Sequence, residues 1–425
     1  MKKTLLLTIC CILSFAASAQ DKFVGGDISM LKKFIEEGAI YNDKDGNAVQ
    51  PLAFFKEQGW NAMRVRLFVD PTKATTDERK QGAIQDLDYV IALSKDIKEA
   101  GFKLMLDFHY SDTWTDPGKH STPNAWSSMT VDQMKTKVYD YTKDCLDKMN
   151  KAGATPDFIQ TGNEITVGML WPTGHVYASG GAPSGGSWDN FAGYLANAIK
   201  ACNEMCPQAQ IVIHTEMHAP NDVIKFYQQL ANYTDIKYDI IGLSYYPDWH
   251  GAFSVLGETL TTLESQFADK KIQIVETGYG FEWQLSGPKY DFTSTYPLTD
   301  EGQRKWTADF IEVLNQHNNV NGLFWWYPEY TLNNIVFKGG SEDWSKNFTA
   351  GYWNASLFHY KTGNAHLALY EMKSFLGDPS GIETINREPL TVNQHAWYTL
   401  DGRKLNGAPN QRGIYIHNGK KMVVR

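Results

Sequence analysis

The sequence predicts a (β/α)8 barrel followed by a small C-terminal antiparallel β tail. Eight short apolar runs alternate with amphipathic stretches, and this alternation is typical of a parallel sheet whose strands are connected by helices. Several of the runs end in charged or polar residues, as the strands of a barrel enzyme do at its active face. The 425 residues, 42% of them hydrophobic, are sufficient for one barrel and an appendage.

The apolar runs define the predicted strands: Phe23–Ile28, Asn61–Phe68, Lys103–His109, Asp157–Gly162, Gln210–His214, Tyr238–Tyr245, Ile272–Glu276 and Asn321–Trp326. The clearest predicted helices between them are Gln81–Ala100, Val131–Lys151, Trp188–Met205 and Asp300–Gln316. An open, doubly wound sheet is the alternative. It would need a glycine-rich phosphate loop after the first strand, and Gly25-Gly26-Asp27 lacks that spacing.

Residues 1–19 have the pattern of a cleavable signal peptide. Lys2 and Lys3 precede an apolar stretch from Leu5 to Phe15, and Ala17-Ser18-Ala19 supplies a small-residue cleavage site. The apolar stretch is too short to span a membrane, and no later segment is long and apolar enough to do so. We therefore expect a protein exported to the periplasm, the cell surface or the extracellular medium.

Residues 20–377 are predicted to form the catalytic domain, and residues 378–425 a small β domain. In the second segment, Asp401-Gly402 and Asn418-Gly419 lie between alternating apolar residues, which is a hairpin signal. For this tail, a structural or sorting role is favoured over carbohydrate binding.

Composition narrows the choice of partner. The formal net charge is −8 and no basic patch occurs, so nucleic acid is a poor partner and a neutral polymer is a better one. Aromatic residues make up 13% of the chain, and sugar rings stack on aromatic faces, although ordinary packing accounts for about half of such residues. We expect Cys145, Cys202 and Cys206 to be buried free thiols. We also expect the protein to be a monomer.

Two glutamates at predicted strand ends are the strongest functional signal. Glu164 ends the run that starts at Asp157, and Glu276 ends the run Ile272–Glu276. Two carboxylates that face each other across a barrel mouth are what glycoside hydrolysis requires. Asn163, directly before Glu164, places an amide where it can bind a sugar hydroxyl.

Further polar and aromatic residues cluster at the same predicted rim. Arg64 and Arg66 alternate along the second strand, so their side chains share one face. The same rim is predicted to carry, from the other strands and the loops after them, Asp107, His109, Trp114, His214, Tyr245, Trp249 and Trp326. Each of them alone can be read as an ordinary interior polar or core aromatic residue. Together they predict a substrate cleft.

Several motifs resemble those of glycoside hydrolase family 53, the endo-β-1,4-galactanases. They occur in order between residue 25 and about residue 375: Gly26–Ser29, Arg64–Arg66, Asp107–Lys119, Thr161–Ile165, Gly168–Pro172, Gly242–Pro247, Val275–Thr277 and Ser356–Phe358. The Asn-Glu pair marks only a clan of retaining barrel glycosidases, whereas Asp107–Lys119 and Ser244–Pro247 are more specific. The resemblance, not the spacing, implies β-1,4-galactan, the backbone of type I arabinogalactan in pectin side chains, as the substrate.

Such an enzyme works by double displacement, with Glu276 as nucleophile and Glu164 as acid and then base. The two carboxyls are expected about 5–5.5 Å apart. Arg64 near Glu276 is expected to lower the pKa of Glu276, while the pKa of Glu164 is raised. Tyr245 is expected to donate a hydrogen bond to Glu276, and Trp326 to form the floor beneath the bound sugar.

No cofactor is expected. Several family members carry a calcium loop between strands seven and eight. Here residues 288–296 contain one carboxylate, Asp291, too few for a cation that takes six to eight oxygens, so structural calcium is not expected.

Three alternatives differ in testable ways. A mannanase, xylanase or cellulase of the same clan would share the carboxylates and differ in its loops. A metal-dependent barrel hydrolase could recruit His214, Asp107 and His109, but the paired histidines it normally needs on the first strand are absent. A non-catalytic glycan-binding barrel would not need both carboxylates.

Overall fold

The computed structural model describes residues 22–217, 220–284, 287, 289–334, 352–377, 397–399, 404–405, 409, 413–417 and 420–424. It divides into two compact units, Met1–Leu376 and Gly377–Arg425. The predicted signal peptide lies outside the described residues.

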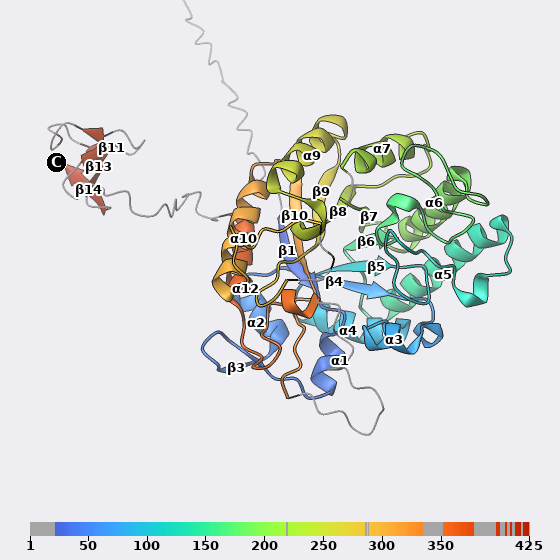
Figure 1. Cartoon of the computed structure of the whole chain (residues 1–425), viewed down its shortest axis with the longest axis horizontal. Coiled ribbons are helices and arrows are strands. Elements are labelled where there is room, and N and C mark those ends of the chain that lie inside the picture. Colours follow the sequence, from blue (N-terminus) through green and yellow to red (C-terminus); the bar gives the residue numbers. More distant parts are fainter. Residues whose placement is uncertain are drawn as a thin grey trace, which may run out of the picture. The chain divides into compact units, whose positions relative to one another are not determined.

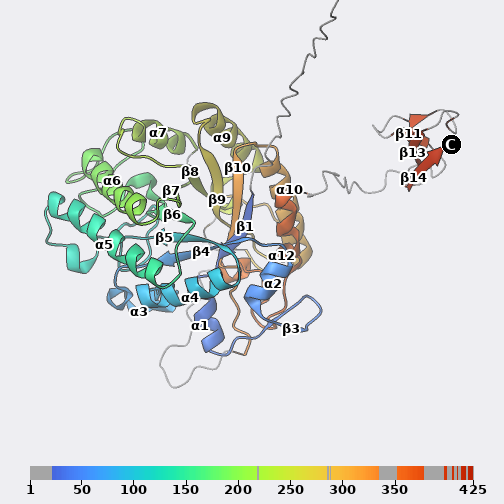
Figure 2. The same cartoon turned by 180° about the vertical axis from the view of Figure 1, so that it is seen from behind.

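The first unit contains a closed barrel of eight parallel strands, so the predicted fold class is confirmed (Figures 1 and 2). In chain order the strands are β1 Phe23–Asp27, β4 Ala62–Leu67, β5 Lys103–Phe108, β6 Phe158–Thr161, β7 Gln210–Glu216, β8 Ile240–Tyr245, β9 Lys271–Thr277 and β10 Val320–Trp326. All eight coincide with predicted runs. At the C-terminal ends of the strands, the largest difference between prediction and structure is in β7. This strand continues two residues past the predicted end at His214 and carries Glu216 to the rim.

Helices surround the barrel (Figure 1). They are α1 Leu31–Glu36, α2 Pro51–Glu57, α3 Thr76–Lys80, α4 Leu87–Glu99, α5 Val131–Lys151, α6 Trp188–Met205, α7 Pro220–Leu230, α8 Pro247–His250, α9 Phe253–Gln266, α10 Asp300–Asn315 and α12 Leu367–Glu371. A short antiparallel pair, β2 Tyr41–Asn42 and β3 Ala48–Val49, follows α1.

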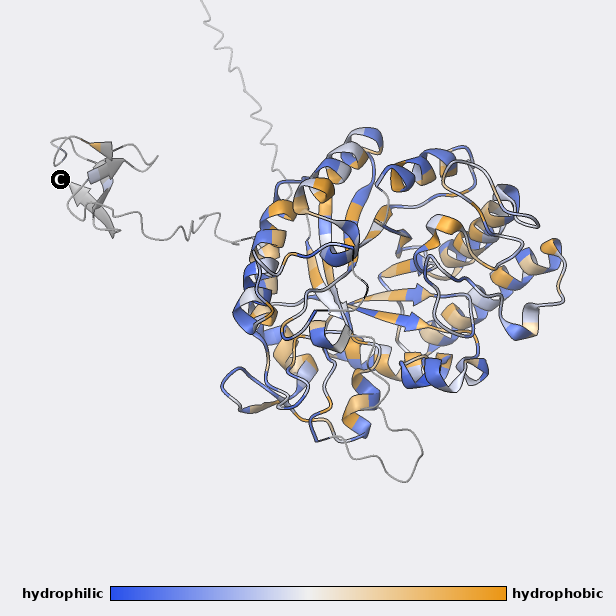
Figure 3. Ribbon diagram, in the orientation of Figure 1, coloured by the Kyte–Doolittle hydropathy of each residue, from blue (hydrophilic) through white to orange (hydrophobic). Residues whose placement is uncertain are grey.

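Local signals explain where the long helices begin and end. Thr130 and Gln133 form a reciprocal capping box at the start of α5, which begins and ends as predicted. The predicted helix from Gln81 instead begins at Leu87, because the Asp86 side chain accepts a hydrogen bond from the Tyr89 N–H and caps α4 there. Hydrophobic and hydrophilic residues alternate along these helices, as Figure 3 shows, so each presents an apolar face to the barrel.

The barrel interior has an apolar layer and a polar layer. The apolar layer is a buried cluster, no member more than 2% exposed, made of Ala62, Met105, Phe158, Val212, Ile240, Val275 and Phe324. Phe23, in edge-to-face contact with Phe158 at 4.9 Å, packs against this cluster. The polar side chains lie nearer the C-terminal ends of the strands, which is where barrel enzymes carry their active sites.

A β-bulge interrupts the pairing of β8 with β9 next to the predicted nucleophile. Leu243 pairs with Ile274, but Ser244 pairs with Glu276, so Val275 is one extra residue on β9. A bulge re-aims the side chain that follows it. Here it points Glu276 into the barrel mouth and leaves Val275 in the apolar layer below.

The second unit is a four-stranded antiparallel sheet in the order β12-β11-β13-β14. Its strands are β11 Trp397–Thr399, β12 Lys404–Leu405, β13 Gly413–His417 and β14 Lys420–Val424, which confirms the predicted antiparallel tail.

Two expectations about the whole chain can be compared with the described residues. Cys145, Cys202 and Cys206 are buried free thiols, as predicted. No helix in the described ranges is long and apolar enough to cross a membrane.

Candidate active site

The strand register aligns the polar residues in one layer. Asp27 of β1 pairs with Arg64 of β4, Arg66 of β4 pairs with Asp107 of β5, and Asp107 pairs with Gln160 of β6. Inward-facing residues at matching heights therefore meet at the top of the barrel.

Arg64 lies at the centre of this layer and is 1% exposed. Its Nη1 donates to Asp27 Oδ2 at 2.8 Å, and its Nη2 to Asp107 Oδ2 at 2.8 Å. The same Nη2 lies 2.9 Å from Glu276 Oε1 and 2.9 Å from Asn163 Oδ1. A buried guanidinium needs acidic partners, and the strand-end carboxylates supply them as predicted.

Glu276 is 7% exposed and is held by two donors. Arg64 contacts Oε1, and the Tyr246 hydroxyl donates to Oε2 at 3.1 Å. Burial raises the pKa of Glu276 to about 7, and the positive charge of Arg64 opposes that rise. The prediction of a low pKa is therefore wrong, because the loss of hydration outweighs the ion pair.

The prediction that Tyr245 bonds to Glu276 is also wrong. Tyr245 is fully buried on the outer side of β8, where its ring stacks on Phe310 at 5.4 Å and its hydroxyl donates to the Gly251 carbonyl at 2.6 Å. Side chains alternate along a strand, so Ser244 and Tyr246 face the barrel mouth and Tyr245 faces the helices. The same alternation was available in the sequence.

Glu164 lies on the turn after β6, and its side chain is partly exposed. Its backbone N–H donates to His214 Nδ1 at 3.2 Å, which leaves the imidazole proton on Nε2, 2.8 Å from Ser244 Oγ. Burial and then the charge of Glu276 raise the pKa of Glu164 well above its ordinary value, while a hydrogen bond from Ser244 opposes this. The predicted raised pKa is confirmed.

Asn163 is bound by the protein at both ends of its amide. Oδ1 accepts from Arg64, and Nδ2 donates to the Thr115 carbonyl at 2.8 Å. Gly162 makes the preceding turn possible: its φ is +109°, and a Cβ there would lie 2.6 Å from Ile165 Cγ2.

Four predicted substrate-binding residues are almost completely buried: Arg66, Asp107, His109 and His214, none more than 3% exposed. His109 Nε2 lies 3.2 Å from Asp107 Oδ2, and His109 Nδ1 accepts from the Thr115 N–H at 3.2 Å. Asp107 accepts from Arg64, and His214 accepts from the Glu164 N–H, so these two side chains hold Arg64 and Glu164 in place.

Trp114 and Trp326 form a partly exposed aromatic wall beside this layer, with ring centroids 6.3 Å apart. The guanidinium of Arg66 lies 4.5 Å from the Trp114 ring and 4.7 Å from the Tyr327 ring, and its Nη1 donates to Asp27 Oδ1 at 2.9 Å. Arg66 thus anchors the wall to the same aspartate that holds Arg64.

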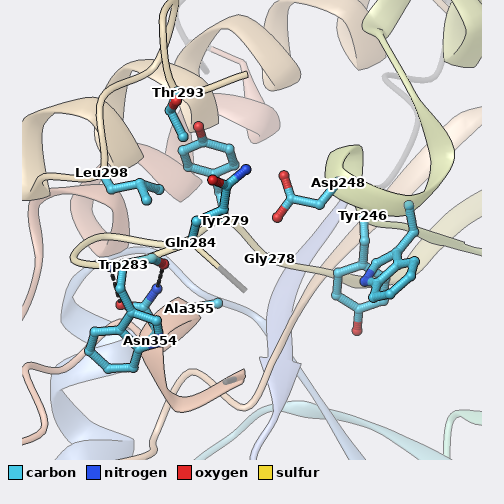
Figure 4. Close-up of a pocket in the computed structure, with 12 residues that line it drawn as sticks. Tyr246, Asp248, Gly278, Tyr279, Trp283, Gln284, Thr293, Leu298, Asn354 and Ala355 are labelled. Atoms are coloured by element: carbon cyan, nitrogen blue, oxygen red, sulfur yellow. Dashed lines mark hydrogen bonds between the residues drawn. The ribbon is translucent and has the colours of Figure 1, made fainter. Parts of the chain in front are cut away.

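A small pocket lies beside Tyr246, the residue whose hydroxyl bonds to Glu276 (Figure 4). Tyr246, which bonds to Glu276, and Gly278, two residues after it, both line the pocket, and so does Trp249. The Asp248 carboxylate points into the space between Tyr246 and Tyr279. Burial, followed by the charge of Asp291, raises the pKa of Asp248 to about 6.

No group of three or more His, Cys, Asp or Glu side chains is arranged to hold a metal ion in the described ranges. Residues 289–296 carry one carboxylate, Asp291, which accepts from the Thr293 N–H at 2.8 Å. The expectation that the enzyme needs no calcium stays a prediction.

The structure adds residues that the sequence analysis did not single out: Asp27, His120, Gln160, Glu216, Ser244 and Tyr246. Asp27, Ser244 and Tyr246 lie within quoted motifs, and Gln160 shares the inward face of its strand. His120 and Glu216 had no signal of this kind, because a long loop and an extended strand end bring them to the site.

Comparison with known proteins gives consistent results. The pattern of glycosyl hydrolase family 53 matches residues 23–372. A probable arabinogalactan endo-beta-1,4-galactanase A from Neosartorya fischeri is 31% identical over 78% of this chain and 91% of its own. An arabinogalactan endo-beta-1,4-galactanase from Thermothelomyces thermophilus is 32% identical over 70% of this chain and 86% of its own.

Solved structures show the same relationship. The family 53 catalytic domain from Ignisphaera aggregans has a TM-score of 0.70 at 30% identity, covering 83% of this chain and 95% of that domain. A fungal beta-1,4-galactanase structure has a TM-score of 0.67 at 27% identity, covering 83% and 98%. The chain belongs to glycosyl hydrolase family 53.

Proposed function

We propose that this protein is an exported, endo-acting, retaining hydrolase of β-1,4-galactan that releases galacto-oligosaccharides. The observation that carries the proposal is the pair Glu164 and Glu276 on β6 and β9, with Arg64 bonded to Glu276 alone of the two. The similarity of this chain to arabinogalactan endo-beta-1,4-galactanases supports galactan as the polysaccharide.

In the proposed reaction, the Glu276 carboxylate attacks the anomeric carbon while Glu164 gives its proton to the departing sugar oxygen. The resulting glycosyl–enzyme ester is then cleaved by water, from which Glu164 takes a proton. Arg64 and Tyr246 hold Glu276 in position for attack. Because Glu164 has no described cation beside it and its pKa is well raised, it keeps its proton until the leaving oxygen needs it.

The aromatic wall and the pocket beside Tyr246 would bind the sugar chain. Trp114 and Trp326 offer ring faces for the apolar side of a galactose unit, and Trp326 would lie beneath the reacting sugar. Trp249 and Asp248 would contact units farther from the cleavage point. No cofactor is part of this proposal, and the protein is expected to act as a monomer.

Proton NMR of the first products formed from linear β-1,4-galactan tests the mechanism. The proposal requires a β-anomer at first, and an initial α-anomer would overturn double displacement. Reducing-sugar release from galactan, mannan, xylan and cellulose tests the substrate. Faster release from one of the other three would assign the enzyme to a different specificity within the same clan.

A further inference from the structure

The main chain at Glu164 is held in an unfavourable conformation. Glu164 has φ +48° and ψ +50°, in the left-handed region. A residue with a Cβ pays a steric cost there, so surrounding groups must hold it. The side chain of Glu164 takes its direction from this backbone, so whatever holds the backbone helps to aim the carboxyl, together with the hydrogen bond from Ser244.

Two buried histidines contact the two sides of this residue's main chain. The Glu164 N–H donates to His214 Nδ1, and the Glu164 carbonyl oxygen lies 3.2 Å from His120 Nε2. A carbonyl oxygen only accepts, so the His120 proton is on Nε2 and points at Glu164. His214 comes from β7, and His120 from the long loop after β5, which lie on either side of β6 in the barrel.

His120 is itself firmly anchored. Its side chain is 1% exposed, its carbonyl accepts from the Trp171 N–H at 2.8 Å, and its ring lies 5.6 Å from the Trp171 ring. Within the described residues its Nδ1 has no hydrogen-bond partner, so the bond to Glu164 is the polar contact that orients the ring. Burial lowers the pKa of His120 to about 3, so the ring stays neutral at working pH.

We propose that His120 is a positioning residue for the acid/base Glu164, acting by donating a fixed hydrogen bond to the Glu164 carbonyl. This inference rests on the role that the proposed function gives Glu164. Proton transfer demands hydrogen-bond reach between the acid and the leaving oxygen, and a shift of about 1 Å can cost about 100-fold in rate. Glu276 is held separately by Arg64 and Tyr246, so nucleophilic attack does not depend on His120.

The test compares two substrates that differ in their need for an acid. Galactan has a poor leaving group and needs the proton of Glu164. In a dinitrophenyl β-1,4-galactobioside, the dinitrophenolate group departs without being protonated. Adding azide to the second assay removes the need for a base in the second step. His120→Phe keeps a ring and removes the donor, and His120→Gln supplies an amide N–H that can reach the same carbonyl.

For His120→Phe we expect kcat on galactan to fall about 10-fold to 100-fold, with KM little changed. Its rate on the dinitrophenyl substrate with azide should stay within about threefold of the wild type. His120→Gln should recover most of the galactan rate. His175→Ala is the matched control, because His175 stacks on the same Trp171 ring at 3.7 Å and has no described bond to Glu164. This variant should keep the wild-type ratio of the galactan rate to the dinitrophenyl rate.

Equal losses on both substrates, or an unchanged galactan rate in His120→Phe, would overturn the inference. If His120→Phe does not fold, His120→Asn takes its place, because its shorter amide cannot reach the carbonyl. Glu164→Gln run in parallel separates the two hypotheses. If Glu164→Gln loses activity equally on both substrates, the proposed role of Glu164 is wrong. If Glu164→Gln loses activity only on galactan and His120→Phe loses it equally on both substrates, only the present inference fails.

Discussion

Glu164 and Glu276 are the same residue type at the ends of two strands of one barrel, yet their surroundings differ. Glu276 contacts a guanidinium and a phenol hydroxyl through its carboxylate oxygens. Glu164 is bordered by His214 and His120, both neutral because burial lowers their pKa values, and both bonded to its main chain.

This difference separates the two chemical tasks. Burial raises both pKa values, but Arg64 limits the rise at Glu276, and the negative charge of Glu276 adds to the rise at Glu164. The protein thus holds the nucleophile through its carboxylate, whereas it holds the acid through its backbone as well as through the Ser244 hydrogen bond to its carboxyl. Each carboxyl thus affects the protonation of the other, and the Arg64 charge favours the anion at Glu276.

The largest expected effect comes from removing either carboxylate. Glu276→Ala should lose at least about 10⁴-fold in kcat, because no covalent intermediate can form. Azide should then yield the glycosyl azide of inverted configuration. Glu164→Ala should lose about 10²-fold to 10⁴-fold on galactan, and azide should yield the azide of retained configuration. The products are identified by NMR, and swapped configurations would reverse the two assignments.

Removing the Arg64 guanidinium should affect Glu276 more than Glu164. Arg64→Met leaves buried carboxylates without their partner and should cost about 3–5 kcal/mol of unfolding free energy. The substitution should also raise the pKa of Glu276. The acid limb of the pH–rate profile, where the nucleophile becomes protonated, should therefore move to higher pH. Urea unfolding and a pH–rate profile measure the two effects. An unshifted acid limb would mean that Arg64 does not set the charge of Glu276.

Neutralising the nucleophile should stabilise the fold in a pH-dependent way. Because the folded-state pKa of Glu276 is raised from 4.5 to about 7, its burial costs nothing below that range, where both states are protonated. The penalty grows as pH rises from 4.5 to about 7 and is constant above that, where both states are ionised. Glu276→Gln should therefore exceed the wild type in stability by about 1–3 kcal/mol at pH 7.5 and by little at pH 4.5. Thermal midpoints at both pH values provide the check, and a gap that is equal at both would contradict this.

Loss of the C-terminal unit should leave both carboxylates undisturbed. A chain that ends before Asp378 keeps every residue of the candidate site, so its kcat/KM on galactan should stay within about threefold of the full chain. A folded, truncated protein with most of its activity gone would show that the tail takes part in substrate binding.

The smallest expected effect is that of chelation, since two carboxylates carry out the proposed chemistry without a metal. Excess EDTA should leave activity unchanged and move the thermal midpoint by less than about 2 °C. A large drop that calcium restores would reveal a structural ion bound through ligands outside the described arrangement.

Much of this architecture can be predicted from the sequence because its signals are local. Apolar runs that end in Glu164 and Glu276 identify two barrel strands, and the i, i+2 spacing of Arg64 and Arg66 places both side chains on one face. Thr130 and Gln133 locate the start of α5 by their own hydrogen bonds. Even the wrong assignment of Tyr245 to the barrel mouth could have been avoided, because side chains alternate between the two faces of a strand and this alternation can be read from the sequence.

Other features depend on contacts between distant segments. The pKa of Glu276 depends on how fully the barrel buries it, and no spacing in the sequence measures desolvation. The bulge at Val275 exists only in the pairing of β8 with β9. The approach of His120 to Glu164 joins a loop to a strand end 44 residues away. The sequence alone therefore determined most of the residues that reach the barrel mouth. Only the tertiary structure brought His120 and Glu216 there and decided which side chains touch, because contact and burial are properties of the folded chain.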